Sequence, residues 1–141
     1  MNDVGNVTAI TIGEIEAISG VLEGITFHKA AGALGVTAFG LSVVDLEPGA
    51  SSYPEHDHSE AGMGGRMFAK RPQQLEQEEV YFALRGSGTV VADGESYPLD
   101  VDHAVRVGPE VVRKVVPGPE GLRLLAIGGT PGQPYETGGT L

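Results

Sequence analysis

Hydrophobic and polar positions along the chain follow the pattern of short β-strands separated by turns. The longest β-rich segment covers residues 36–46 and is followed by Pro48-Gly49. Residues 80–84 form a second segment, and Gly86-Ser87-Gly88 is expected to turn the chain into a third at residues 89–92. Each segment is rich in Val, Leu, Tyr, Phe or Thr, the residue types that favour strands.

The same alternation of β-rich segments and turn signals continues through the second half of the chain. Asp93-Gly94 predicts a tight hairpin turn, because glycine tolerates a positive φ. The β-rich segments beyond it are residues 96–99, 104–107, 111–116 and 122–127, and Pro117-Gly118-Pro119 is expected to end the run that precedes it. Strands of this size with turns about every 8–12 residues favour an all-β sandwich or barrel.

The two ends of the chain depart from this pattern. Residues 7–12 alternate like a strand, and residues 14–18 are compatible with one helical turn before Gly20. The tail from residue 130 is rich in glycine and proline and is expected to be flexible. Neither an internal repeat nor a shift in composition marks a second domain.

Composition narrows the functional classes. The 141 residues carry 9 Lys and Arg against 19 Asp and Glu, for a formal net charge of −10. This charge argues against nucleic acid and against an anionic membrane surface as partners. The absence of cysteine excludes disulfides, iron–sulfur clusters and cysteine nucleophiles. No apolar run is long enough to span a membrane and no export signal is visible, so a cytoplasmic location is expected by default.

One segment, residues 59–78, interrupts the strand rhythm. It combines Gly62, Gly64 and Gly65 with a cluster of Met63, Met67 and Phe68 and with balanced charge. A long segment without predicted structure inside a compact domain is usually either functional or disordered. A lid over a binding site and a solvated insertion are therefore both open interpretations.

The candidate metal-binding residues lie just before and just after this segment. In His56-Asp57-His58 the two imidazoles are two residues apart, so in an extended chain both lie on one face and can reach one ion. Glu79 opens the next strand and can supply a carboxylate. Two histidines and one carboxylate suit non-haem iron and other divalent ions. Glu78 must then point the opposite way from Glu79.

These residues resemble the first motif of the cupins. The stretch from Glu79 to Gly86 has the spacing of that motif, whereas Gly49 lies one residue too far from His56 and residues 59–78 appear as an insertion. The resemblance covers residues 38–129 and implies a small single-domain cupin with a double-stranded β-helix, a jelly-roll-like barrel. The expected organisation is an N-terminal extension (1–35), the barrel (36–129) with its inserted loop, and the tail (130–141).

The second motif of the cupins is degenerate in this chain. At the usual spacing its ligand histidine falls on Arg113. An alternative alignment on Pro98 and His103 leaves too little chain for the intervening strands, so His103 is expected to be structural or exposed. His28 has no partner in view and is not expected to bind metal.

Arg113 leaves two chemical outcomes open. If its guanidinium points into the barrel, the expected orientation, it weakens binding of a divalent ion and pairs with Glu79, which gives a metal-free pocket. If it lies at the rim, His56, His58 and Glu79 can hold the ion and Arg113 can bind a substrate carboxylate in a bidentate manner.

Three functions compete at this stage. The first is a metal-dependent cupin enzyme of the oxygenase or isomerase/lyase type, with Fe, Mn, Ni or Zn on His56, His58 and Glu79. The second is a metal-free cupin that binds or senses a small molecule through Arg113. In both, Arg113, Tyr81 and Arg106 are the candidate substrate-binding residues. The third is a structural or interaction module, because the resemblance implies a homodimer, with residues 7–12 as the candidate edge.

Overall fold

Antiparallel β-strands make up most of the computed structural model, which describes residues 7–19, 23–50 and 77–132. The elements in chain order are the 3-10 helix η1 (Ile12–Glu14), β1 (Ala17–Ile18), β2 (Ile25–His28), α1 (Ala30–Leu34), β3 (Gly40–Leu46), β4 (Glu78–Ala92), β5 (Glu95–Leu99), β6 (Val105–Val107) and β7 (Arg113–Gly129). The two histidines of the candidate metal site, nearly all of the inserted segment and the end of the tail lie outside the described residues.

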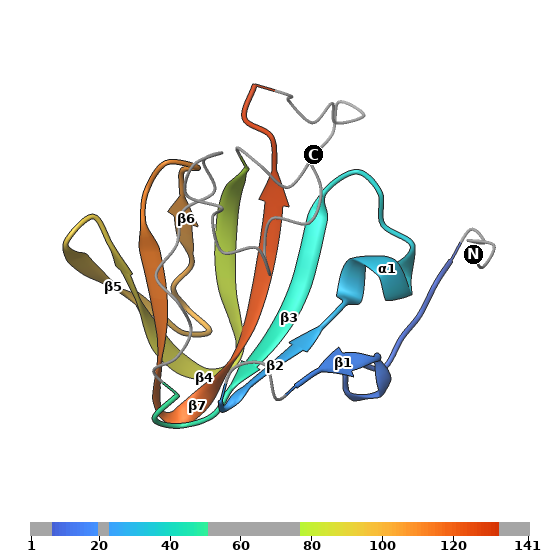
Figure 1. Cartoon of the computed structure of the whole chain (residues 1–141), viewed down its shortest axis with the longest axis horizontal. Helices are drawn as coiled ribbons and strands as arrows, with labels where there is room; N and C mark the ends of the chain where they lie inside the picture. The colour runs from blue at the N-terminus through green and yellow to red at the C-terminus, as the bar shows by residue number, and fades with distance from the viewer. Residues whose placement is uncertain (1–6, 20–22, 51–76, 133–141) are drawn as a thin grey trace.

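The two longest strands, β4 and β7, pair with each other from end to end. The strand order is β1-β2-β3-β7-β4-β5, and β6 pairs with the first residues of β4. The first half of β4 therefore lies between β6 and the second half of β7, whereas its second half lies between β5 and the first half of β7. Figure 1 shows β3, β7 and β4 side by side, with β5 folded away to one side. Together with the structural comparisons given below, this all-β arrangement confirms the predicted barrel architecture.

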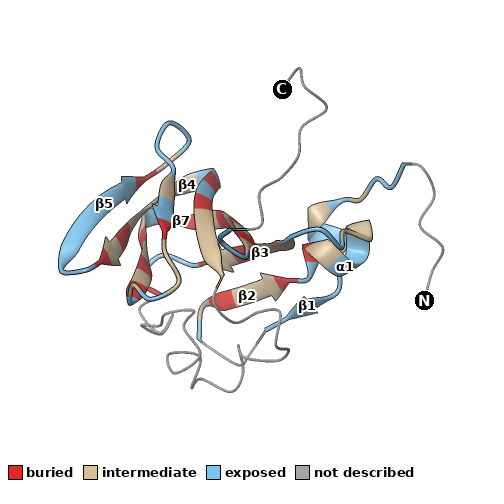
Figure 2. Cartoon of the chain, turned by 90° about the horizontal axis from the view of Figure 1, so that it is seen from above, coloured by how far each residue is buried: buried red, intermediate tan, exposed pale blue. Residues whose placement is uncertain are grey.

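Alternate residues along the long strands point into a common apolar core. On β4 these include Tyr81, Ala83 and Val90, and on β7 they include Val115 and Leu124. Buried positions consequently alternate with less buried ones along both strands, as Figure 2 shows. This period-two burial is what a sheet with one face toward a core requires.

The bend in β4 corrects the prediction of a turn at Gly86-Ser87-Gly88. The strand continues through these residues with irregular pairing, and φ of Gly86 is +76°. A Cβ atom on Gly86 would overlap the carbonyl oxygen of Gly121, because the two strands approach each other closely here. Glycines inside a strand often mark such a bulge or bend rather than a hairpin.

A second correction concerns Pro117-Gly118-Pro119, which does not end a strand. Strand β7 runs through these residues, and Pro117 pairs with Gly88 at the bend of β4. The Asp93-Gly94 hairpin, in contrast, is confirmed: both residues have positive φ, at 54° and 79°. The two values match the type I′ turn that favours two-residue hairpins.

The N-terminal region differs most from expectation. Residues 7–11 form no strand, and the predicted helical turn at 14–18 is replaced by η1 followed by β1. Val7 is 86% exposed, and no strand in the described ranges pairs with residues 7–11. Strand β2 and helix α1 were not predicted, and β1 and β2 extend the sheet beyond β3. No helix within the described ranges is long and apolar enough to cross a bilayer.

A charged cluster joins three neighbouring strands on the outer face of the sheet. Asp45 accepts two hydrogen bonds from Arg123, at 2.7 Å to Nε and 2.9 Å to Nη2. His28 Nε2 lies 2.8 Å from the same carboxylate. The hydrogen bond from Arg123 is the largest cause that lowers the pKa of Asp45 below its usual value, and His28 contributes in the same direction. His28 is thus a structural residue in the part of the chain that the structure describes.

The glycine at the bend gives a first prediction. Gly86→Ala is expected to destabilise the protein by about 1–3 kcal/mol from the positive φ alone, which alanine adopts unfavourably. Steric overlap of its methyl group with the Gly121 carbonyl oxygen should add to this loss. Chemical denaturation measures the change. The matched control is Gly129→Ala, since a Cβ there has no atom within 4 Å. Equal stability of the two variants would contradict this account of the bend.

The outer cluster gives a second prediction. A lowered folded-state pKa means that the charge of Asp45 stabilises the fold above the unfolded pKa and loses this effect as pH falls through the folded value. Asp45→Asn is therefore expected to cost about 1–2 kcal/mol at pH 7, discounted for partial exposure. The difference should shrink in melting curves taken toward pH 2. If the stability difference between Asp45→Asn and the unmodified protein stays constant as the pH falls, the ionic explanation is excluded. It is also excluded if Asp102→Asn loses as much stability as Asp45→Asn.

Candidate functional site

Glu79 and Tyr81 lie on the inner face at the start of β4. Tyr81 is fully buried, and its hydroxyl donates a 2.5 Å hydrogen bond to Glu79 Oε1. The Glu79 side chain retains 14% exposure, so it remains within reach of a small molecule. A bond from a hydroxyl to an ionised carboxylate is among the stronger hydrogen bonds. Tyr81 therefore fixes the orientation of the Glu79 carboxylate.

Arg113, the first residue of β7, is completely buried, as expected from its alignment with the ligand histidine of the second motif. Its Nη2 donates to the carbonyl oxygens of Val107 and Gly108, at 3.3 and 3.1 Å. Its Nε and Nη1 have no hydrogen-bond partner among the described residues. Leaving donors of a buried cation unmatched is costly, at roughly 1–3 kcal/mol or more for each group. An additional acceptor at these two nitrogens would therefore stabilise the buried guanidinium.

The bent strands bring Arg113 and Glu79 together. Nη2 of Arg113 lies 3.8 Å from Oε1 of Glu79, the oxygen that also accepts from Tyr81. The distance exceeds that of a direct hydrogen bond, so the contact is an ion pair across a short gap. A positive charge next to a negative one in the barrel interior offsets part of the cost of burying both.

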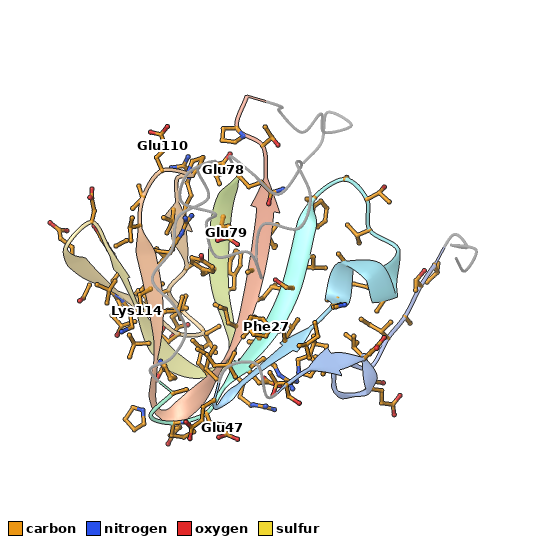
Figure 3. All side chains as sticks on the ribbon, viewed as in Figure 1. Phe27, Glu47, Glu78, Glu79, Glu110 and Lys114 are labelled. Carbon is orange, nitrogen blue, oxygen red and sulfur yellow. The ribbon has the colours of Figure 1, made fainter. Side chains whose placement is uncertain are left out.

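Arg106, the remaining candidate from the sequence, does not join this group. It pairs with Val80 in the sheet and therefore shares the outward face of β4. Its Nε donates a 2.6 Å hydrogen bond to Glu78 Oε1, and 60% of its side chain is exposed. Figure 3 shows Glu78 at the start of β4 and Glu79 lying over the strands. The two neighbouring glutamates thus point to opposite sides, as predicted.

The inner face beside Glu79 is lined by residues with small side chains. In register across the three central strands, Glu79 lies in one row with Gly128 and Gly40. The next row contains Tyr81, Ala126 and Ser42, and the rows below it contain Ala83, Leu124 and Val44, then Leu122 and Leu46. On β3 and β7 the side-chain volume therefore decreases from the apolar core toward the row of Glu79. On β4 the large side chains in these upper rows are those of Tyr81 and Glu79.

Two further polar residues lie on or beside this part of the inner face, and the sequence analysis did not identify either of them. Gln77 precedes Glu79 by two residues, and its Oε1 lies 2.9 Å from the position of a Cβ on Gly128 and 3.7 Å from that on Gly40. The amide of Gln77 therefore rests against the glycine pair. Ser42 lies in the row of Tyr81. Period-two spacing from Glu79 was a signal for Gln77, whereas Ser42 required knowledge of the strand register.

A surface groove of about 500 Å³ runs beside the site, along β5, β6 and the loop that follows β6. Its lining includes Val107 and Gly108, whose carbonyls hold Arg113. It also includes His103, which lies 2.7 Å from Asp100 through Nδ1. The Asp100 carboxylate raises the pKa of His103. His103 is exposed and structural, as predicted.

The described residues provide an incomplete fit to a metal ion. Glu79 is the one predicted ligand among them, and they contain no group of three His, Cys, Asp or Glu side chains that could hold a metal. A guanidinium about 5 Å from a divalent ion costs roughly 6–7 kcal/mol at an effective dielectric constant of 20. Structural zinc binding provides about 10–16 kcal/mol in peptides. Arg113 therefore opposes an ion on Glu79 and removes a large share of that affinity.

Comparison with known proteins defines the class of fold. The structure is similar to a cupin protein from Bacteroides fragilis, with a TM-score of 0.65 and 19% identity, covering 94% of this chain and 92% of that one. It is also similar to a sugar phosphate isomerase of the cupin superfamily from Silicibacter pomeroyi, with a TM-score of 0.65 and 21% identity, covering 86% and 74%.

A third similar structure is the polyketide cyclase RemF from Streptomyces resistomycificus, with a TM-score of 0.64, 18% identity and coverage of 93% and 87%. No protein-family model matches the sequence, and no curated protein matches it. The chain therefore has the cupin fold. This confirms, at the level of the fold, the resemblance seen in the sequence.

Proposed function

We propose that this chain is a small-molecule-binding cupin whose barrel holds a carboxylate, with Arg113 as the anchor and Glu79 beside the bound molecule. The observation that carries the proposal is the pair of unmatched donors on a completely buried guanidinium. Arginine presents its donors as a planar fork that matches the two oxygens of a carboxylate. A bound carboxylate would satisfy the donors that the described residues leave without partners.

The charge inside the barrel favours a singly charged ligand. Arg113 is the one arginine or lysine with a fully buried side chain among the described residues, and Glu79 already faces it. Because Glu79 already offsets the charge of Arg113, a bound carboxylate would leave one negative charge uncompensated and a doubly charged phosphate would leave two. Each uncompensated charge is expensive to bury, so the carboxylate is the less costly of the two anions. Glu79 and Tyr81 would then lie next to the ligand. The carboxylate of Glu79 could accept a proton or a hydrogen bond from the bound molecule.

Removing the guanidinium tests the anchor. Arg113→Met keeps an unbranched apolar stem but removes the guanidinium and its charge, and it is expected to weaken carboxylate binding at least about tenfold, the equivalent of about 1.4 kcal/mol. Isothermal titration calorimetry with a panel of small carboxylates provides the measurement. Arg113→Lys, which keeps the charge without the fork, should bind with intermediate affinity.

Arg106→Met is the matched control, because Arg106 lies on the outer face and pairs with Glu78. It should leave the affinity unchanged. Melting curves for each variant separate a loss of binding from a loss of folding. Affinity that survives Arg113→Met in a folded protein would overturn the proposed anchor.

A metal-dependent enzyme is the second candidate function, with His56, His58 and Glu79 as ligands of Fe, Mn, Ni or Zn. The observation in its favour is the inward position of Glu79, and two similar structures carry the names of an isomerase and a cyclase. A bound ion would act as a Lewis acid toward a substrate oxygen. The guanidinium of Arg113, 3.8 Å from Glu79 Oε1, weighs against this candidate.

Elemental analysis of protein purified without a histidine tag distinguishes the two candidates. The metal-free function predicts substoichiometric metal, and no rise in melting temperature on addition of Fe, Mn, Ni or Zn. Stoichiometric metal that is lost together in Glu79→Gln and His56→Ala would instead establish the metal-dependent site. Glu78→Gln, the outward-facing neighbour, serves as the control because it should not change the metal content.

A further inference from the structure

We propose that the groove between β5 and β6 holds an aromatic ring carried by the acid that Arg113 binds. The ligand of this chain would therefore be an aromatic carboxylate. This inference rests on the proposed function, because it assumes that Arg113 binds the carboxylate, and it adds the chemical class of the remainder of the molecule. The groove has a volume of about 500 Å³, within the range of small-molecule sites, and five residues form its inner lining: Ala92, Tyr97, Val105, Val107 and Val111.

The strand register places this groove next to the two charged residues of the candidate site. Ala92 pairs with Arg113 on one side of the barrel, and Val107 pairs with Glu79 on the other. Directly paired residues on one face of a sheet have Cβ atoms about 4.5–5.5 Å apart. Arg113 also contacts the lining itself, because its Nη2 donates to the carbonyl oxygens of Val107 and Gly108. A molecule anchored at Arg113 would therefore extend into the groove within one strand spacing.

Tyr97 presents an uncovered aromatic ring to the groove. It pairs with Val90, which is fully buried, and therefore lies on the inner face of β5, yet it is 39% exposed. Leu99, two residues further along the same face, is fully buried. The Tyr97 hydroxyl donates a 3.0 Å hydrogen bond to Glu95, which restrains the ring. An inward-facing ring that the described residues leave uncovered is a surface on which a second ring can stack.

The rest of the lining suits an apolar group. Apolar side chains come from β6 and the loop that follows it: Val105, Val107 and Val111. Two of the three titratable residues of the groove already have partners, since Arg106 donates to Glu78 and His103 lies 2.7 Å from Asp100. The third, Asp93, lies in the exposed hairpin turn. These polar groups therefore do not require a polar substituent on the bound ring.

Three acids test the groove in the full chain by titration calorimetry. Propanoate reports on the anchor alone, 3-phenylpropanoate adds an aromatic ring, and 3-cyclohexylpropanoate adds a saturated ring of the same carbon skeleton. Burial of the phenyl ring is expected to tighten binding at least about tenfold over propanoate. The phenyl acid should also bind about threefold tighter than the cyclohexyl acid, because two aromatic rings attract each other beyond the effect of buried area.

Substitutions at Tyr97 test the stacking surface. Tyr97→Ala is expected to weaken 3-phenylpropanoate at least about fivefold and to leave propanoate unchanged, whereas Tyr97→Phe keeps the ring and should keep the affinity. The matched control is Phe82→Ala, which removes a ring that is 40% exposed on the outer face of β4 and should leave all three affinities unchanged. Melting curves identify any variant whose loss of affinity is a loss of folding.

The outcomes separate this inference from the proposed function. If the three acids bind equally and all are lost in Arg113→Met, the anchor stands and the ring site is refuted. The ring site is also refuted if Tyr97→Ala, folded, keeps the full affinity for 3-phenylpropanoate. If no acid binds, both proposals are overturned. If 3-phenylpropanoate is lost in Tyr97→Ala but retained in folded Arg113→Met, the groove binds the ring and the anchor is overturned.

Discussion

The pairing of β4 with β7 along their entire lengths is the constraint on which the rest of the structure depends. Each strand contributes one half to each side of the barrel, so the bend that they share joins the two sides. The bend requires close backbone approach at Gly86 and Gly121, where a side chain on Gly86 has no room. All other strands attach to this central pair or to strands that it supports.

The same bend explains how a charged site arises inside an apolar barrel. Arg113 and Glu79 belong to opposite halves of the β4–β7 ladder, and the curvature of the strands lets their side chains meet. Burying a guanidinium is unfavourable unless its donors find acceptors. Two backbone carbonyls satisfy one nitrogen and leave two nitrogens without partners in the described part of the chain. The fold thus carries an energetic cost that an anionic ligand would reduce.

Period-two patterning predicted most of the strands and the opposite orientations of Glu78 and Glu79, because alternation fixes the relative faces of neighbouring residues in a strand. The spacing of the cupin motif selected Glu79 as the inward residue. It misassigned Gly86-Ser87-Gly88 and Pro117-Gly118-Pro119, since the residues that make turns also make bends in continuous strands. The interior position of Arg113 followed from the spacing of the cupin motif. The position of Ser42 in the row of Tyr81 could not be predicted, because it depends on register with strands far away in sequence.

The nested arrangement of the strands has a consequence for the order in which the molecule assembles. The Asp93-Gly94 hairpin closes the shortest loop, and the ladder between β4 and β7 begins at the pair Ala92 and Arg113. Short loops close at the lowest entropic cost, so we infer that pairing spreads outward from there. Glu79 lies near the far end of the ladder, so in this order Arg113 is placed before its carboxylate neighbour. The ion pair between them would then be among the later contacts of the barrel to form.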